Sequence, residues 1–386
     1  MIKNKSKTNK VPVIVLNGFL GSGKTTLFIN LLSQARKKNI PVCAIVNDMS
    51  ELDVDGQLIG GAEIVEDDKS IMQSIHSCVL SSEEGIEKLD KAINRLLVAQ
   101  NPNLIIIETS GSCHPMPLVK YFKEHEVVKL TALLVLVDCL LMAHDFNYGE
   151  NLIPIFKENL KNDRRNTINL LVEQILFCSH LILTKPDRVQ DDKLKIIASH
   201  VKNINPFVTS HSVVYGQLTI ESLLEVEDYN YYNVEKLIKE LDPLPEKSDR
   251  PYEIRTIVIK DDRPFHPKRL WEVCHNYLDK EIYRSKGFFW LASREQYALL
   301  WNQSGGDIGL EIVGTWRKAI LENENHGLIE EEISFLKEKL SKEKGLFGDR
   351  HCKLTVIGNK KKVDFFAEKL KTCFLSKEEV VRNLAE

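Results

Sequence analysis

The stretch Gly18–Thr26, "GFLGSGKTT", determines how the first part of this chain folds. It matches the pattern GxxxxGK[ST] and stands between an apolar run, "VPVIVL", and an amphipathic stretch, "TTLFINLLSQARKK". A strand, a glycine-rich loop and a helix in this order form a P-loop, in which backbone N–H groups and a helix N-terminus bind phosphate. The motif in this context predicts a nucleotide-binding site.

Each part of the motif has a physical task. Gly18, Gly21 and Gly23 let the backbone curl close to phosphate oxygens, an approach that a side chain would block. Lys24 is expected to meet the β- and γ-phosphates, and the Thr25 hydroxyl to ligate Mg²⁺. The residues expected to bind the nucleotide here are Gly18, Gly21, Ser22, Gly23, Lys24, Thr25 and Thr26. The complete motif in its context disfavours the alternative, an ordinary glycine-rich turn.

Two later motifs extend this site. "LIIIETSG" places Glu108 at the end of a predicted buried strand, where its carboxylate can reach Mg²⁺ or its water, and Gly111 can offer a backbone N–H to the γ-phosphate. With Lys24, these two residues form the expected catalytic set.

"LILTKPD" follows a later apolar run and resembles the [NT]KxD motif of GTPases, with Thr184, Lys185 and Asp187 as the nucleotide-binding residues. Asp187 would accept two hydrogen bonds from a guanine edge that adenine lacks, and the stem of Lys185 would cover the base. The motif favours GTP. A "KPD" surface turn is common, so an ATP-using P-loop enzyme remains an alternative.

The length of 386 residues exceeds what one hydrophobic core usually reaches, which predicts two domains. From Val11 onward, short apolar runs alternate with amphipathic stretches, as in an α/β fold with a mostly parallel sheet covered on both faces. The polar stretch 147–169 suggests an exposed, mobile loop. The predicted parts are a disordered tail (1–10), a P-loop domain (11–225), a linker (226–251) and a smaller α+β domain (252–378).

Composition argues against several functions. The formal net charge of -3 gives no reason to expect a nucleic-acid partner, and no apolar run is long enough to span a bilayer. The tail "MIKNKSKTNK" is not followed by a signal-peptide segment, so a cytoplasmic location is expected. The eight cysteines are scattered without a CxxC pair, which disfavours a disulfide framework or a zinc ribbon.

Taken together, "GFLGSGKTT", "VNDMSELDVDG", "ETSG" and "TKPD" are similar to the motifs of the CobW-type family of P-loop GTPases, relatives of HypB and UreG. In the second half, "RPFHPKRLW", "GFFWLASR", "WNQSGG" and "FGDRHCKLTVIG" resemble the CobW C-terminal domain. The resemblance implies a Mg²⁺-dependent GTPase that couples GTP hydrolysis to the delivery of zinc or cobalt to a client metalloprotein.

The chain departs from this family at one place. The family's CxCC motif aligns with "HSCV", His76–Val79, so only one cysteine remains of a set that would bind zinc tightly. His76 and Cys78 lie two apart on an extended segment and point the same way, so they could bind one ion together with Glu51. The alternative is an ordinary loop, in a GTP-regulated binding or scaffold protein that has lost metal transfer.

Overall fold

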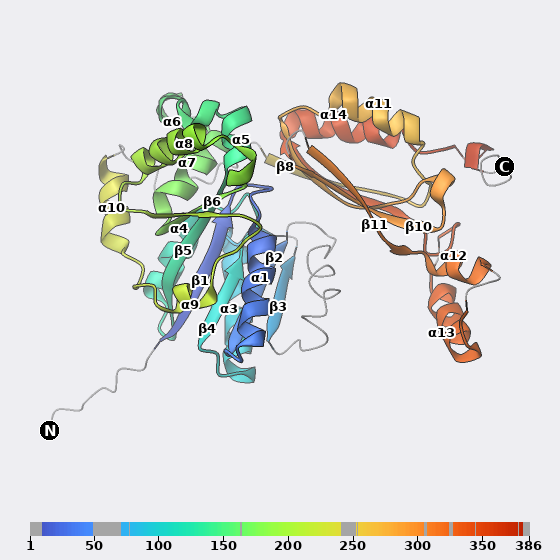
Figure 1. Cartoon of the computed structure of the whole chain (residues 1–386), viewed down its shortest axis with the longest axis horizontal. Helices are drawn as coiled ribbons and strands as arrows, with labels where there is room; N and C mark the ends of the chain where they lie inside the picture. The colour runs from blue at the N-terminus through green and yellow to red at the C-terminus, as the bar shows by residue number, and fades with distance from the viewer. Residues whose placement is uncertain are drawn as a thin grey trace. The chain divides into compact units, whose positions relative to one another are not determined.

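The protein divides into two compact units, here described from a computed structural model (Figure 1). The described residues before Ile254 form the first unit and those from Ile254 onward form the second. The structure describes residues 10–48, 71–76, 78–162, 164–240, 252, 254–304, 307–323, 327–343, 345–376 and 378–380.

The first unit is built on a seven-stranded sheet in which every neighbouring pair of strands is parallel. The strand order is β3-β2-β4-β1-β5-β6-β7, so β1 and its following loop lie at the centre of the sheet. The strands are β1 (Val11–Gly18), β2 (Val42–Asp48), β3 (Met72–His76), β4 (Leu104–Glu108), β5 (Val128–Asp138), β6 (His180–Thr184) and β7 (Thr209–Val213).

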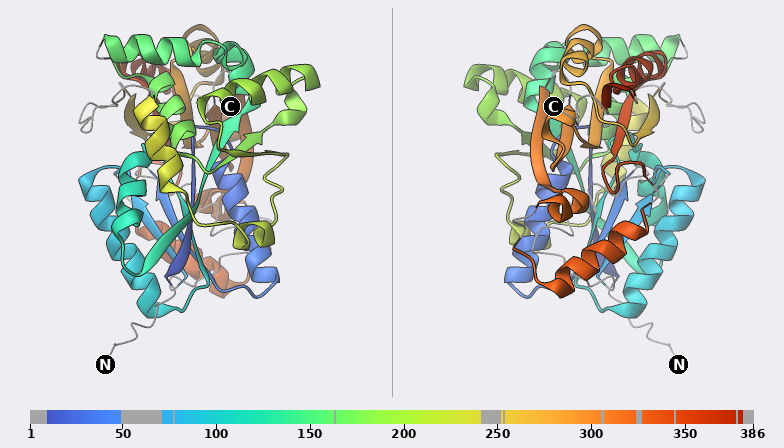
Figure 2. Two further views of the ribbon diagram at one scale, coloured as in Figure 1. Left: turned by 90° about the vertical axis from the view of Figure 1, so that its left-hand side faces the viewer. Right: turned by 90° about the vertical axis from the view of Figure 1, so that its right-hand side faces the viewer.

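Helices cover both faces of this sheet, as two further views show (Figure 2). On one face, α1 packs its apolar side, including Leu27 and Leu31, against alternate residues of the central strands. On the other, α4 and α7 pack against β5 and α3 packs against β3. The helices are α1 (Lys24–Lys37), α3 (Glu83–Ala99), α4 (Pro115–Glu124), α5 (Cys139–Asp145), α6 (Leu152–Lys161), α7 (Thr167–Phe177), α8 (Asp191–Ile204), α9 (Ile220–Leu224) and α10 (Tyr231–Glu240), with short 3₁₀ turns η1 (Asn147–Gly149) and η2 (Pro186–Arg188).

Two of these helices lie where the sequence suggested irregular chain. The stretch 147–169 contains α6, which buries Leu152 and Phe156, four residues apart on one helix face. In the predicted linker, α10 buries Val234 and Leu237 and packs against α7. Both helices carry many charged residues and bury only a narrow apolar side, which is why composition alone suggested irregular chain.

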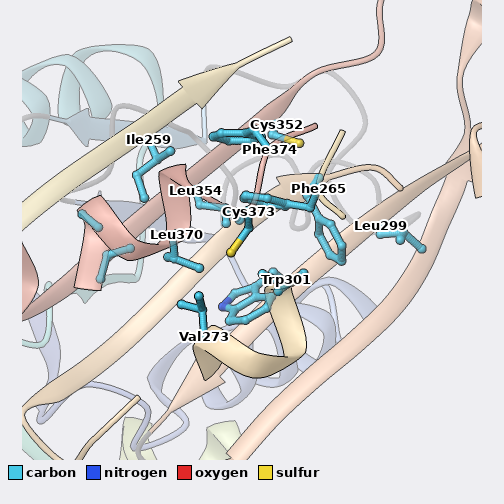
Figure 3. Packing of buried hydrophobic residues seen from close by; sticks show 14 of the residues in the cluster. Ile259, Phe265, Val273, Leu299, Trp301, Cys352, Leu354, Leu370, Cys373 and Phe374 are labelled. Atoms are coloured by element: carbon cyan, nitrogen blue, oxygen red, sulfur yellow. The ribbon is translucent and has the colours of Figure 1, made fainter. Parts of the chain in front are cut away.

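The second unit is an antiparallel five-stranded sheet in the order β11-β10-β9-β12-β8, as an α+β fold predicts. Val273 of α11 and Leu370 of α14 lie beside Trp301 in its core (Figure 3). Its elements are β8 (Ile254–Asp261), α11 (Pro267–Tyr277), β9 (Ile282–Phe289), η3 (Ala292–Arg294), β10 (Tyr297–Ser304), β11 (Asp307–Thr315), α12 (Arg317–Glu322), α13 (Glu330–Ser341), β12 (Cys352–Asn359) and α14 (Lys360–Lys371). Across the described part of the chain, every helix is too short or too polar to cross a bilayer.

Candidate nucleotide-binding site

The loop between β1 and α1 has the backbone that its glycines predict. Gly18, Gly21 and Gly23 have φ angles of 135°, 76° and 90°, which L side chains rarely adopt. A Cβ atom on Gly18 would also lie only 2.4 Å from the carbonyl oxygen of Leu136 on the neighbouring strand β5. The loop therefore delivers the chain to the N-terminus of α1, where backbone N–H groups can bind phosphate.

Lys24 and Thr25 begin α1 and face the site from its base. Lys24 is only 5% exposed, and its Nζ donates to the carbonyl oxygens of Gly18 (2.8 Å) and Phe19 (2.9 Å). The Thr25 hydroxyl donates to Oε1 of Glu108 at 2.6 Å. Because β4 is the neighbour of β1 and Glu108 is in register with Leu16, the sheet itself holds this carboxylate beside the P-loop.

A loop from Thr109 to His114, here called the sensor loop, follows Glu108 and lies against the P-loop. A Cβ atom on Gly111 would lie 2.6 Å from Leu20 Cδ2 and 2.7 Å from the Leu20 backbone nitrogen, so only glycine allows this approach. Gln174 of α7 donates through Nε2 to the carbonyl oxygens of Gly111 (3.3 Å) and Cys113 (3.2 Å). The sensor loop is thus held between the P-loop and α7.

The "TKPD" segment lies at the same edge of the sheet, after β6. The Thr184 hydroxyl donates to the carbonyl oxygens of Ser22 (2.9 Å) and Val137 (3.3 Å), which joins this segment to the P-loop. Lys185 has a left-handed backbone (φ 53°), and its ammonium pairs with Asp138 at 2.5 Å. Asp187 is exposed in η2, where a ligand can reach its carboxylate.

The segment with His76 and Cys78 lies at the sheet edge beyond β2. His76 ends β3, and within the described residues its Nδ1 atom is buried without a hydrogen-bond partner. Cys78 is 8% exposed, and burial raises the pKa of its thiol although the nearby Lys88 acts in the opposite direction. No three His, Cys, Asp or Glu side chains of the described ranges are grouped to hold a metal ion. Glu51, the third predicted ligand, lies outside those ranges.

Asn47, on β2, joins this segment to the sensor loop, a link that the sequence did not reveal. Its Nδ2 donates to the carbonyl oxygens of Ile75 (3.2 Å) and Cys78 (2.8 Å), and its Oδ1 accepts from the Ser110 backbone N–H (3.3 Å). Asn47 lies within the stretch "VNDMSELDVDG" and Gln174 lies in no quoted motif, but local sequence could not show the contacts of either, because both bind backbone carbonyls of distant segments.

The central P-loop strand, the carboxylate on its neighbour and the parallel sheet place this chain in the class of P-loop nucleotide-binding proteins. The family model described as CobW/HypB/UreG, nucleotide-binding domain, matches residues 12–211, and the Cobalamin synthesis protein cobW C-terminal domain matches residues 254–374. The chain belongs to the CobW/HypB/UreG family. The fold and the family that the sequence motifs predicted are confirmed; the roles of single site residues stay predictions.

Several curated relatives carry names that mention zinc. A zinc-regulated GTPase metalloprotein activator 1 from Dictyostelium discoideum is 28% identical over 96% of this chain and 81% of its own length. The zinc chaperone YjiA from Escherichia coli is 26% identical over 73% of this chain and 83% of its own length. The crystal structure of Zn(II)-bound YjiA GTPase from E. coli aligns with 95% of this chain and all of that one, at 17% identity and a TM-score of 0.38.

Proposed function

We propose that this protein is a Mg²⁺-dependent GTPase that couples GTP hydrolysis to the delivery of zinc or cobalt to a client metalloprotein in the cytoplasm. One observation carries the hydrolytic part: the Thr25 hydroxyl and the Glu108 carboxylate are 2.6 Å apart beneath the P-loop. Such hard oxygen ligands suit Mg²⁺, so the residues present fit the ion that this chemistry needs. When bound, Mg²⁺ would neutralise charge on the β- and γ-phosphates.

Residues of the chain itself would bind and position the phosphates and the base of GTP. Lys24 would exchange its two carbonyl partners for phosphate oxygens, which a cation binds more strongly than neutral carbonyls. The Gly111 N–H would donate to the γ-phosphate, because the loop already lies against the P-loop at Leu20. Asp187 would accept hydrogen bonds from the guanine edge, which favours GTP over ATP.

The metal part of the proposal is supported by the relatives' names and by His76. An imidazole nitrogen buried without a partner costs free energy, and coordination to a metal ion would remove that cost. Cys78 would add a thiolate after losing its proton, and Glu51 or a client side chain would complete the set. Relatives named as zinc chaperones favour this function over a scaffold protein that has lost metal transfer.

Three variants test the hydrolytic part with purified protein, GTP and Mg²⁺. Lys24→Ala should abolish phosphate release, while Lys37→Ala, at the exposed far end of the same helix, should keep the parent rate. Glu108→Gln should raise the Mg²⁺ concentration needed for half-maximal phosphate release, because an amide binds Mg²⁺ more weakly than a carboxylate. Unchanged phosphate release from the Lys24→Ala variant would rule out the proposed GTPase site.

Zinc titration tests the metal part in the nucleotide-free and the GTP-analogue-bound protein. Removal of a residue that only orients a metal ligand typically weakens metal binding by about tenfold or more. Removal of a ligand itself should therefore weaken zinc binding by more than about tenfold. His76→Ala and Cys78→Ala should both show this loss. Cys43→Ala should not, because Cys43 is a buried thiol on β2 that is not among the predicted ligands. If both ligand variants bind zinc as the parent does, the site lies elsewhere.

A further inference from the structure

A carboxylate is buried in the first unit at a place that the nucleotide site does not use. Glu173 of α7 is fully buried and receives three kinds of donor. Nη2 of Arg165 lies 2.5 and 2.6 Å from its two oxygens, Nε2 of His114 lies 3.0 Å away, and the Tyr252 hydroxyl donates to Oε2. A buried charge is tolerated only with such partners, so these four side chains depend on one another.

The rings of the cluster also hold Tyr252. Its ring stacks on His114, with centroids 6.1 Å apart and planes at 26°, and the Arg165 guanidinium lies 4.9 Å from its centroid. Burial, with Glu173 close by, raises the pKa of Tyr252 well above its usual range, so the phenol stays a neutral donor. Burial also opposes ionisation of Glu173, but the donors His114 and Arg165 outweigh it and lower the pKa of Glu173. Glu173, Arg165 and His114 therefore hold Tyr252 by a hydrogen bond, a cation–π contact and ring stacking, and these three residues are here called the clamp.

Two neighbours on α7 connect this clamp to the nucleotide site. Glu173 holds His114, the last residue of the sensor loop, while Gln174 holds Gly111 and Cys113 within it. From the other side, Asn17 of β1 donates to the carbonyl oxygen of Cys113 at 3.3 Å. A shift of α7 or of His114 would therefore either move this part of the loop, including Gly111, or break buried hydrogen bonds that hold it.

Tyr252 has a particular place in the chain. It belongs to the first unit, and in the sequence it stands two residues before β8 (Ile254–Asp261), the first strand of the second unit. The covalent connection to that unit begins directly after a residue whose side chain is bound to Glu173. A pull on the connection from the second unit would therefore be passed to Tyr252 across one intervening residue.

We propose that Tyr252 and Gln174 are positioning residues for the γ-phosphate, through which the connection to the second unit controls how tightly the first unit binds GTP. This inference rests on the proposed GTP site, and it adds the regulation of that site. With Tyr252 seated on Glu173 and His114, the sensor loop keeps Gly111 against the P-loop. When Tyr252 leaves, His114 and Gly111 lose their fixed position, and affinity for the γ-phosphate falls.

Two substitutions test this inference in the full chain. Tyr252→Phe keeps the ring and removes the donor to Glu173, while Gln174→Met keeps the side-chain length and removes the donor to Gly111 and Cys113. The affinity of a non-hydrolysable GTP analogue should fall by between about twofold and thirtyfold in each, the usual range for coupling residues. GDP affinity should stay at the parent value, because GDP lacks the phosphate that Gly111 would bind.

A matched control is Tyr229→Phe. Tyr229 is also buried and its hydroxyl donates to a carbonyl oxygen of α7, that of Phe177; among the described residues it forms no hydrogen bond or ring contact with the sensor loop. This variant should lower the free energy of unfolding but keep the parent's ratio of GTP-analogue affinity to GDP affinity. If Tyr252→Phe leaves both affinities unchanged or lowers both equally, the inference is overturned.

A measurement without substitutions covers the case in which Tyr252→Phe does not fold. In the parent protein, hydrogen exchange in the peptide that contains Tyr252 should be slower with the GTP analogue than with GDP, and equal rates would refute the coupling. The two proposals fail differently. A parent that neither hydrolyses GTP nor prefers the analogue over GDP contradicts the proposed function, whereas a parent that does both, with unchanged variants, contradicts only the coupling.

Discussion

Replacing Asn47 with alanine should release the Cys78 segment from nucleotide control. The side chain is 4% exposed and makes three hydrogen bonds, to the carbonyl oxygens of Ile75 and Cys78 and from the Ser110 N–H. At roughly 1 kcal/mol net for each bond, the variant should lose about 3 kcal/mol of unfolding free energy. For a unit of this size that corresponds to a fall in Tm of about 6 to 12 °C.

The informative assay is the alkylation rate of Cys78, followed by mass spectrometry of its peptide. In the parent, Asn47 ties Cys78 to the residue beside Gly111, so the rate should differ between the GTP-analogue and GDP forms. In the Asn47→Ala variant, Cys78 should react faster and at the same rate in both forms, because the side chain that joins the two segments is gone.

Asn205→Ala is the matched control. Asn205 is 2% exposed, donates to the carbonyl oxygens of Ile175, Leu176 and Cys178, and accepts from the Phe207 N–H. Within the described ranges, its side chain forms no hydrogen bond with the Cys78 segment or the sensor loop. It should lower Tm by a similar amount and leave the nucleotide dependence of Cys78 intact. An Asn47→Ala protein that keeps the parent's difference between the two nucleotide forms would show that the coupling takes another route.

Three further predictions concern the nucleotide site and the buried carboxylate. Asp187→Ala should weaken GTP binding by about 100-fold and leave ATP binding unchanged, since it removes two charge-assisted hydrogen bonds. Asp192→Ala, at another exposed aspartate, is its control. Equal losses for GTP and ATP in a competition assay would argue against guanine recognition by Asp187. Gly111→Ala should cost about 1 to 3 kcal/mol of unfolding free energy, because its Cβ would force the Leu20 backbone aside, and retention of parent stability and GTP hydrolysis would contradict the close approach. Glu173→Gln should lower unfolding free energy by about 3 to 5 kcal/mol at pH 7. Because the folded-state pKa of Glu173 is lowered, its contribution exists above the ordinary carboxyl value of about 4.3 and disappears as pH falls below it, so denaturation curves of parent and variant should converge in acid.

The sequence predicted the parts of the site whose chemistry requires particular residues at a fixed spacing. A P-loop needs its glycines, its lysine and its threonine together, and Glu108 had to follow a buried strand that the sheet places beside Leu16. The contacts of Asn47, Gln174 and Tyr252 had no such local pattern to predict them. Each acts on a segment 31 to 79 positions away in the chain, so its partner is set by tertiary packing rather than by local pattern.

The fold was predicted where apolar periodicity was strong and missed where polar residues were dense. Strand β4 is buried at all five positions and reads as an uninterrupted apolar run, which is typical of a parallel strand covered on both faces. Helices α6 and α10 were missed because each buries only a narrow side. The same polar stretch before α7 contains Arg165, which composition assigned to solvent and which instead pairs with the buried Glu173.

The sensor loop has two sets of restraints, and thermodynamic linkage connects them. Asn47 holds Ser110 and the Cys78 segment, while Gln174 and Glu173 hold Gly111, Cys113 and His114. If the proposed GTP site is correct, an event that loosens either set would lower the affinity for the γ-phosphate, because both sets fix one short loop. Bound GTP would in turn strengthen each set by the same factor by which that set strengthens GTP binding. Metal binding near Cys78 and seating of Tyr252 would then favour the same GTP-bound state. In the proposed cycle, hydrolysis would remove the γ-phosphate from the loop and both restraints would weaken together, which would couple metal release to a change at the connection between the units.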